Sequence, residues 1–179
     1  LFGLDALSSP PPEPVEDGAS FEANARIKAI AYATATGCIA LADDSGLEVD
    51  ALGGAPGVHS AYYAGREGSR PERDARNNVR LLAELRGVPI ERRTARFVCA
   101  MCLADPDGTV VAETRGTFEG VIVEAPRGRG GFGYDPLLLI PDLGVTSAEL
   151  SAEAKNARSH RGVVARRLLA MLRERATRS

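Results

Sequence analysis

Apolar residues recur at helical spacing in three parts of this chain, and the first two parts begin with a capping signal. Ser20 is a typical N-cap, and Ser69 opens a capping box in which Glu72 stands at the N3 position. The pattern predicts helices over about 20–37, 71–86 and 160–175, with glycines ending the first two. The expected core stripes are Ile27, Ile30, Ala31 and Thr34 in the first helix, and Val164, Leu168, Met171 and Leu172 in the last.

Shorter apolar runs between these helices predict strands. Residues 39–42 are expected to form a buried strand, and residues 105–108 have the composition of a tight hairpin turn. Further strands are predicted at about 48–52, 94–105, 109–115, 117–124 and 137–140. The proline-rich residues 1–17 are expected to be an extended loop. Because strands and helices mix without a strict repeat, we predict an α/β fold.

Two adjacent carboxylates, Asp43 and Asp44, follow the apolar run at 39–42 and precede Ser45 and Gly46. Neighbouring strand residues point to opposite faces, so one aspartate can be tied into the scaffold while the other faces a metal ion or a water molecule. Paired acids at a strand end therefore indicate metal-assisted chemistry, although Asp, Ser and Gly also form ordinary turns.

A second dense segment, residues 128–136, contains four glycines together with Phe132 and Tyr134. Glycines let the backbone approach a ligand closely and supply N–H groups for phosphate oxygens, while the two rings offer flat faces to a base. The composition favours nucleotide binding, and a flexible loop between strands is the alternative. We predict that Phe132 stacks on the base.

Lys155, His160 and Arg161 form a third polar group around the start of the last predicted helix. The chain has 22 Lys and Arg residues, of which only Lys28 and Lys155 are lysine. A compact ammonium differs chemically from a guanidinium fork, so the lysine at 155 indicates a polar ligand atom that needs it. The alternatives are a solvated surface lysine and a His–Arg pair that merely opens the helix.

Five segments together resemble the inosine triphosphate pyrophosphatase family, and they occur in the order in which the family has them. They are residues 20–25, 42–47, 53–58, 131–136 and 159–162. The family hydrolyses non-standard purine nucleoside triphosphates to the monophosphate and pyrophosphate. The resemblance implies two lobes around a long, mixed central sheet, with a nucleotide cleft between the lobes, and it implies a homodimer.

The resemblance also implies roles for individual residues. Asp44 is expected to be the principal magnesium ligand or the base that activates water, with Asp43 and Glu22 in support. Glu22 is expected to face Asp44, although an acid in the first turn of a helix is also favoured by the helix dipole and can pair with Arg26. The substrate-binding candidates are Ser45, Phe132, Gly133, Tyr134, Asp135, Lys155, His160 and Arg161, the last three as donors that read the base.

The start of the chain departs from the family. Members begin with a strand and a phosphate-binding turn of the form Ser/Thr-x-Asn-x-x-Lys, whereas this chain opens at Leu1 and has no such turn before Ser20. We expect that the native start lies ahead of Leu1. The single domain expected over residues 1–179 would then lack that strand and that turn.

Composition agrees with a compact enzyme. A chain of 179 residues with 44% hydrophobic content can bury a core, and a net charge of −2 excludes an overall basic, nucleic-acid-binding character. No apolar run approaches the ~20 residues that span a bilayer, and no signal peptide is recognisable, so a cytoplasmic location without membrane partners is expected.

Three cysteines, Cys38, Cys99 and Cys102, fit that compartment. Cys99 and Cys102 lie in one predicted strand at a spacing that points them to opposite faces, which disfavours a shared zinc ion or a redox pair. We interpret them as small buried hydrophobic residues.

The predicted reaction is metal-assisted attack of water on the anhydride between the α and β phosphates. This chemistry needs charge neutralisation and positioning, for which Mg²⁺ is suited because it prefers oxygen ligands and bridges carboxylates to phosphates. Two alternatives stay open. One is a pyrophosphatase for pyrimidine or other modified nucleotides, and the other is a non-catalytic nucleotide-binding protein.

Overall fold

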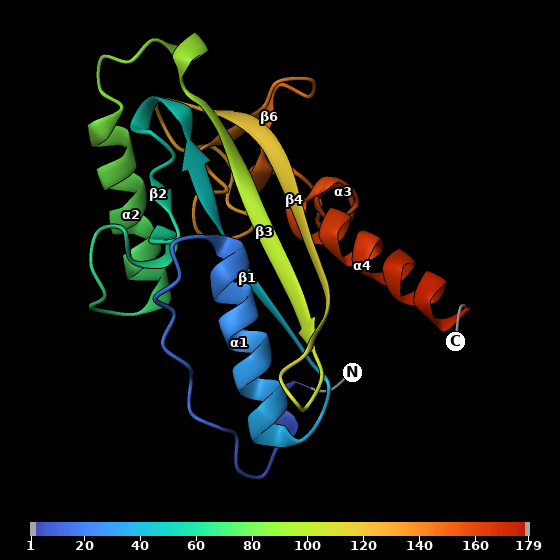
Figure 1. Ribbon diagram of the computed structural model, residues 1–179. Coiled ribbons are helices and arrows are strands. Elements are labelled where there is room, and N and C mark those ends of the chain that lie inside the picture. The colour runs from blue at the N-terminus through green and yellow to red at the C-terminus, as the bar shows by residue number, and fades with distance from the viewer. Residues whose placement is uncertain (1–2, 178–179) are drawn as a thin grey trace.

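A computed structural model describes residues 3–177 as a long antiparallel sheet with helices on both faces (Figure 1). Every strand pairing among these residues is antiparallel, so the described part of the sheet contains no parallel neighbours. In spatial order the six strands are β2 (Pro56–Gly57), β1 (Ala40–Val49), β3 (Thr94–Ala104), β4 (Val110–Ile122), β5 (Leu138–Ile140) and β6 (Val145–Thr146).

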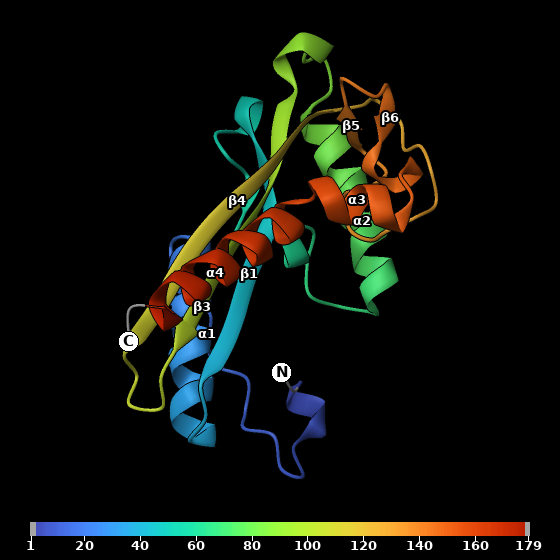
Figure 2. The same cartoon turned by 90° about the vertical axis from the view of Figure 1, so that its right-hand side faces the viewer.

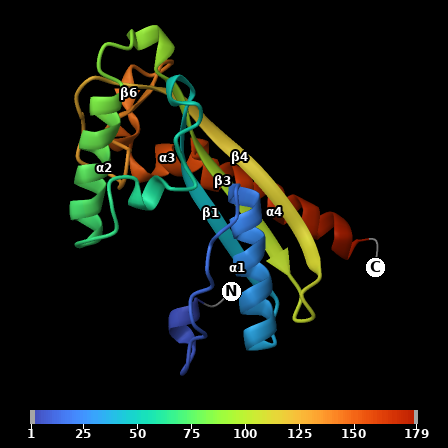
Figure 3. The same ribbon diagram turned by 60° about the vertical axis from the view of Figure 1, so that its left-hand side comes forward.

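The helices divide between the two faces and one end of this sheet. Helix α1 (Phe21–Thr36) covers one face, and α4 (His160–Ala176) crosses the other, as Figure 2 shows. Helix α2 (Arg70–Glu84) and the short α3 (Ala152–Arg158) gather with β5 and β6 at one end (Figures 2 and 3). Among residues 3–177 no helix is long and apolar enough to cross a membrane.

The three predicted helices and the hairpin turn at 105–108 are confirmed. Ser20 caps α1 by accepting a hydrogen bond from the backbone N–H of Ala23, and the capping box of Ser69 and Glu72 opens α2. The turn is closed by the N–H of Gly108, which donates to the carbonyl of Asp105. These features form where the sequence indicated because their interactions are local.

The buried stripe of α1 differs from the predicted one. Instead of the isoleucines, α1 buries Ala25, Ala29 and Ala33 against small residues of β3 that include Ala100 and Cys102. Small side chains on both surfaces let the helix approach the sheet closely. The prediction was based on the hydrophobicity of the side chains, whereas burial at this contact depends on their small size.

Three strand predictions and one core position of the last helix were wrong. Of the strand expected at about 48–52, residues 48 and 49 end β1, and Asp50–Leu52 form a 3₁₀ helix. The segment 39–42 is not buried, since Ile39 is 61% and Leu41 is 38% exposed, and β1 continues through the aspartates to Val49. The runs at 109–115 and 117–124 form the single strand β4. In α4, Val164 and Leu168 are buried and Leu172 is partly buried against the core, as predicted, but Met171 is 42% exposed. Helix α3 was not predicted.

Strand alternation sorts the side chains of the sheet as expected. Asp44 faces α1, whereas Asp43 faces the side of α4. Cys102 packs in the core under α1, and the Cys99 sulfur lies 3.9 Å from Asp43 Oδ2 on the other face. The two cysteines therefore point away from each other.

The crossing of α4 depends on one glycine in β4. A Cβ atom added at Gly116 would lie 2.7 Å from Val164 Cγ2 and 3.3 Å from the carbonyl oxygen of His160. The missing side chain lets the start of α4 rest directly on the strand. This contact places Arg161 beside Asp43 of β1 and His160 beside Phe97 of β3.

Candidate nucleotide site

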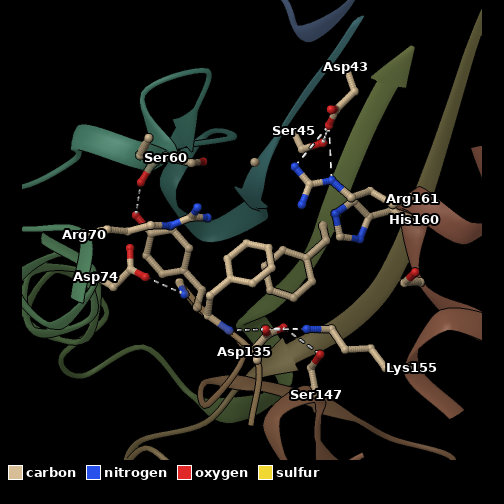
Figure 4. Close-up of a pocket in the computed structure, with 18 of the residues that line it drawn as sticks. Asp43, Ser45, Ser60, Arg70, Asp74, Asp135, Ser147, Lys155, His160 and Arg161 are labelled. Atoms are coloured by element: carbon tan, nitrogen blue, oxygen red, sulfur yellow. Dashed lines mark hydrogen bonds and ion pairs between the residues drawn. The ribbon is translucent and has the colours of Figure 1, made fainter. Parts of the chain in front are cut away.

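A cavity of about 730 Å³ opens between the sheet, α2, the loop at 130–135 and the start of α4 (Figure 4). It has the size of a small-molecule site. All of the substrate-binding candidates line it, together with Asp43 and Asp44. The candidate that does not line it is Glu22.

Asp44 occupies a half-buried position between β1 and α1. Its Oδ2 accepts a hydrogen bond from Asn24 Nδ2 at 3.2 Å, and its Oδ1 lies 3.3 Å from Lys28 Nζ. Burial raises the pKa of Asp44 above the usual value of 3.8, and Lys28 and Asn24 offset this only in part. A carboxylate with a raised pKa is a stronger base, which suits proton abstraction from water.

Lys28 joins Asp44 to a carboxylate that the sequence did not indicate. The Lys28 ammonium lies 2.7 Å from Glu16 and 3.3 Å from Asp44, and its side chain is only 15% exposed. Burial disfavours the charge, but the two carboxylates outweigh burial and raise the pKa of Lys28. The rarity of lysine that drew attention to Lys155 was also a signal for Lys28. No comparable signal marked Glu16, which lies in the proline-rich loop.

Glu22 does not face Asp44. Its Oε1 lies 3.2 Å from Arg115 Nε on β4, and Arg26 pairs with Glu113 rather than with Glu22. Residues two apart on a helix project about 200° apart. Since Asn24 faces Asp44, Glu22 points elsewhere, and the prediction that Glu22 faces Asp44 is wrong.

Asp43 is engaged by an arginine on the opposite face of β1. Its Oδ2 accepts hydrogen bonds from both Nε and Nη2 of Arg161, each at 3.1 Å, and from Ser45 Oγ at 2.9 Å. Asp43 is thus the aspartate tied into the scaffold, and it lies within the strand rather than at its end. The pair holds Arg161 at the cavity wall.

The backbone N–H groups of the glycine loop do not form an open cradle for phosphate. Phe132 N donates to Asp135 Oδ2, Gly133 N to Asp74 Oδ2, and Gly130 N to the carbonyl of Ala148. The phosphate-cradle interpretation is therefore wrong for these three groups. Their hydrogen bonds fix the shape of the loop instead.

The two rings of the loop have different environments. Phe132 is 49% exposed, and the cationic groups of Arg70, Lys155 and Arg161 lie 4.7, 5.2 and 5.6 Å from its ring centre. Tyr134 is 5% exposed in the core, where its hydroxyl donates to the carbonyl of Ser60. Phe132 can therefore present its ring to a base, whereas Tyr134 anchors the loop.

Asp135 organises the floor of the cavity. This carboxylate is 2% exposed and accepts hydrogen bonds from Ser147 Oγ at 2.7 Å, from Phe132 N at 2.8 Å and from Lys155 Nζ. Lys155 is brought there by α3. Asp135 therefore connects the backbone of Phe132 with the Lys155 ammonium.

His160 is buried and uncharged at neutral pH. Its ring stacks on Phe97 at a centre-to-centre distance of 5.2 Å, and it is 8% exposed. Burial, with the charges of Arg161 and Lys155, lowers the pKa of His160 to about 4. The neutral ring donates from one nitrogen only. Its Nδ1 is buried without a hydrogen-bond partner among the described residues.

We expect His160 to make the protein sensitive to mild acid. The unfolded chain binds a proton at the usual pKa of 6.5, whereas the folded chain binds it near 4, so stability falls as the pH drops between these values. When the pH is lowered from 7 to 5, the unfolding free energy of the wild type should decrease by about 2 kcal/mol more than that of His160→Gln. Urea denaturation at both pH values measures this.

The exposed His59 provides the matched control for this experiment. His59→Gln should retain the full loss of stability between pH 7 and pH 5. If His160→Gln also retains the full loss, burial of His160 is not its cause.

The fold and the cavity together define a class of protein. One wall carries a basic carboxylate and a buried ammonium, and the other presents an exposed aromatic ring with hydrogen-bond donors. A ring face recognises a base, and the charged wall suits phosphates and water activation. This is the arrangement of an enzyme that acts on nucleotides.

Comparisons with known proteins identify the family. A model of the Ham1 family matches residues 3–171, and the chain belongs to this family. It is 56% identical to a dITP/XTP pyrophosphatase of Nitratidesulfovibrio vulgaris, over 94% of this chain and 82% of the relative. A solved Ham1 protein from Coxiella burnetii matches with a TM-score of 0.84 and 41% identity, over 91% of this chain and 81% of that one.

A solved dITP/XTP pyrophosphatase from Mycobacterium abscessus is also similar, with a TM-score of 0.75 and 47% identity. The match covers 90% of this chain and 80% of that one. These relatives confirm the resemblance on which the sequence interpretation relied.

Proposed function

We propose that the protein hydrolyses non-standard purine nucleoside triphosphates, namely ITP, dITP and XTP, to the monophosphate and pyrophosphate. The observation that carries this proposal is the cavity that Asp44 and Lys28 line together with the exposed ring of Phe132. The curated relatives are dITP/XTP pyrophosphatases, which supports the same substrates. Removal of these nucleotides would cleanse the nucleotide pool.

The residues of the charged wall supply the chemistry of water attack on the α–β anhydride. Asp44, held by Asn24, accepts the proton of the attacking water, and its raised pKa favours this transfer. Lys28 neutralises charge that develops on the phosphate oxygens. Positioning and charge neutralisation are the main requirements of phosphoryl chemistry.

A magnesium ion fits beside Asp44, a carboxylate that lines the cavity. No group of three or more His, Cys, Asp or Glu side chains gathers as a metal site among residues 3–177. Mg²⁺ is commonly held by one or two carboxylates together with substrate phosphates. We propose that Asp44 would hold it together with the substrate phosphates, because Glu22 does not line the cavity and Asp43 accepts two hydrogen bonds from Arg161. When bound, the ion supplies charge neutralisation at the phosphates.

The other wall reads the base. Phe132 stacks on the purine, and Arg161, His160 and Lys155 supply hydrogen-bond donors. Inosine and xanthosine carry a 6-oxo acceptor where adenosine carries an amino donor. Fixed donors therefore pair with the 6-oxo group of inosine and xanthosine, and they are left unpaired when adenosine binds. The proposal retains the homodimer and cytoplasmic location that the sequence implied, and light scattering after size-exclusion chromatography tests the dimer.

Pyrophosphate release from a panel of nucleotides tests the function. We expect rapid release from ITP and XTP in the presence of Mg²⁺, and release at least about tenfold slower from ATP and UTP. A preference for UTP would support a pyrimidine nucleotide pyrophosphatase instead. Tight binding of ITP with no pyrophosphate release at high Mg²⁺ would support a non-catalytic binding protein.

A further inference from the structure

A polar stripe of α2 contacts the loop at 130–135, which carries Phe132. Arg70, Asp74 and Asn78 are spaced by four residues, so they project from the same side of the helix. Asp74 Oδ2 accepts a hydrogen bond from Gly133 N at 2.9 Å, and Asn78 Nδ2 donates to the Gly133 carbonyl at 3.0 Å. The Arg70 guanidinium lies 4.7 Å from the centre of the Phe132 ring.

These hydrogen bonds fix the backbone on both sides of Phe132. The N–H of Gly133 belongs to the peptide group that follows Phe132, and this group is held by Asp74. The N–H of Phe132 belongs to the preceding peptide group, and it donates to Asp135 Oδ2 at 2.8 Å. The Cα atom of Phe132 is thus held between two anchored peptide planes.

The ring of Phe132 needs such anchors because the core does not hold it. The residue is 49% exposed, and Gly133 next to it has a positive φ of 60°. Glycine can adopt many backbone conformations, so hydrogen bonds are needed to hold the loop in this one. A loop that is ordered only when ligand arrives adds an ordering cost to binding. An anchor from α2 removes that cost in advance.

We propose that Asp74 is a positioning residue that holds Phe132 ready to stack on the base, with Asn78 as the second anchor. The proposal rests on the proposed function, in which Phe132 contacts the purine. Asp74 acts through the oxygen that accepts from Gly133, so its hydrogen-bonding capacity matters and its negative charge does not. A carboxylate that instead bound metal or repelled phosphate would act through its charge.

Two substitutions at one position separate these roles. Asp74→Ala removes the acceptor and should raise KM for ITP about tenfold while kcat stays within about twofold, because binding must now order the loop. Asp74→Asn removes the charge but keeps an amide oxygen that accepts the same hydrogen bond. It should therefore restore KM to near the wild-type value.

A double substitution tests whether Asp74 works through the ring. Phe132→Ala alone should weaken nucleotide binding roughly five- to hundredfold, the scale of a lost stacking contact, with little change in Tm because the ring is exposed. In the Phe132→Ala protein, adding Asp74→Ala should raise KM by less than about twofold. Asn78→Ala should behave like Asp74→Ala with a smaller increase in KM, and it replaces that variant if Asp74→Ala does not fold.

The dissociation constant of the product IMP, measured by calorimetry, gives the same comparison without turnover. If the wild type binds IMP but releases no pyrophosphate from ITP, the proposed function fails while the positioning of Phe132 is still measured. The proposal is overturned if Asp74→Asn is as impaired as Asp74→Ala. It is also overturned if Asp74→Ala weakens IMP binding by the same factor in the wild type and in Phe132→Ala. The same holds if Asp74→Ala lowers Tm and leaves IMP binding unchanged.

Discussion

The Asp44→Asn protein is expected to fold and to hydrolyse ITP at least about a hundredfold more slowly than the wild type. An amide at this position still accepts the hydrogen bond from Asn24, which preserves the local structure. It cannot take a proton from water, and it no longer pairs with the Lys28 ammonium through a full charge. Initial rates at saturating ITP and Mg²⁺ measure the loss, and circular dichroism confirms the fold.

The matched control is Asp50→Asn. Asp50 follows the same strand, but its carboxylate pairs with Arg96 at 2.8 Å and does not line the cavity. Loss of this charge should leave turnover unchanged. Near-normal turnover in a folded Asp44→Asn protein would remove Asp44 from the reaction.

The pH dependence of the wild type adds an independent check on Asp44. Because burial raises its pKa, the carboxylate is protonated at a higher pH than an ordinary aspartate. Activity that needs the ionised form should fall as the pH decreases through this raised pKa. The acid limb of kcat/KM is therefore expected above pH 3.8.

The Arg161→Ala protein is expected to lose discrimination between ITP and ATP. Its kcat/KM for ITP should fall by at least about tenfold more than its kcat/KM for ATP, at about 1.4 kcal/mol for each tenfold step. The guanidinium can only donate hydrogen bonds, so it matches the 6-oxo group of inosine and not the 6-amino group of adenosine. Asp43, which also accepts a hydrogen bond from Ser45, holds this donor at the cavity.

Arg173→Ala serves as the control because Arg173 is an exposed arginine of the same helix outside the cavity. It should leave both efficiencies unchanged. An equal loss for ITP and ATP in Arg161→Ala would assign Arg161 to the phosphates or to the fold rather than to the base. Initial rates with both substrates distinguish these outcomes.

The sequence determined the local features of this protein. Serine caps and the glycine that ends α1 defined the helices, and strand alternation placed Asp43 and Asp44 on opposite faces. Five segments in family order identified the class of enzyme, and three of them, residues 42–47, 131–136 and 159–162, contribute residues that line the cavity. These features are readable because a cap, a turn or an alternating strand depends on residues close together in the chain.

Only the tertiary structure decided which side chains meet. Arg161 is 118 residues from its partner Asp43, and Gly133 is 59 residues from Asp74. Glu16 meets Lys28 because the loop before α1 folds along the helix, and Glu22 pairs with Arg115 of β4 instead of facing Asp44. Such contacts depend on how packed elements lie against one another, and that arrangement cannot be read from local residue type and spacing because it is set by many interactions between distant residues.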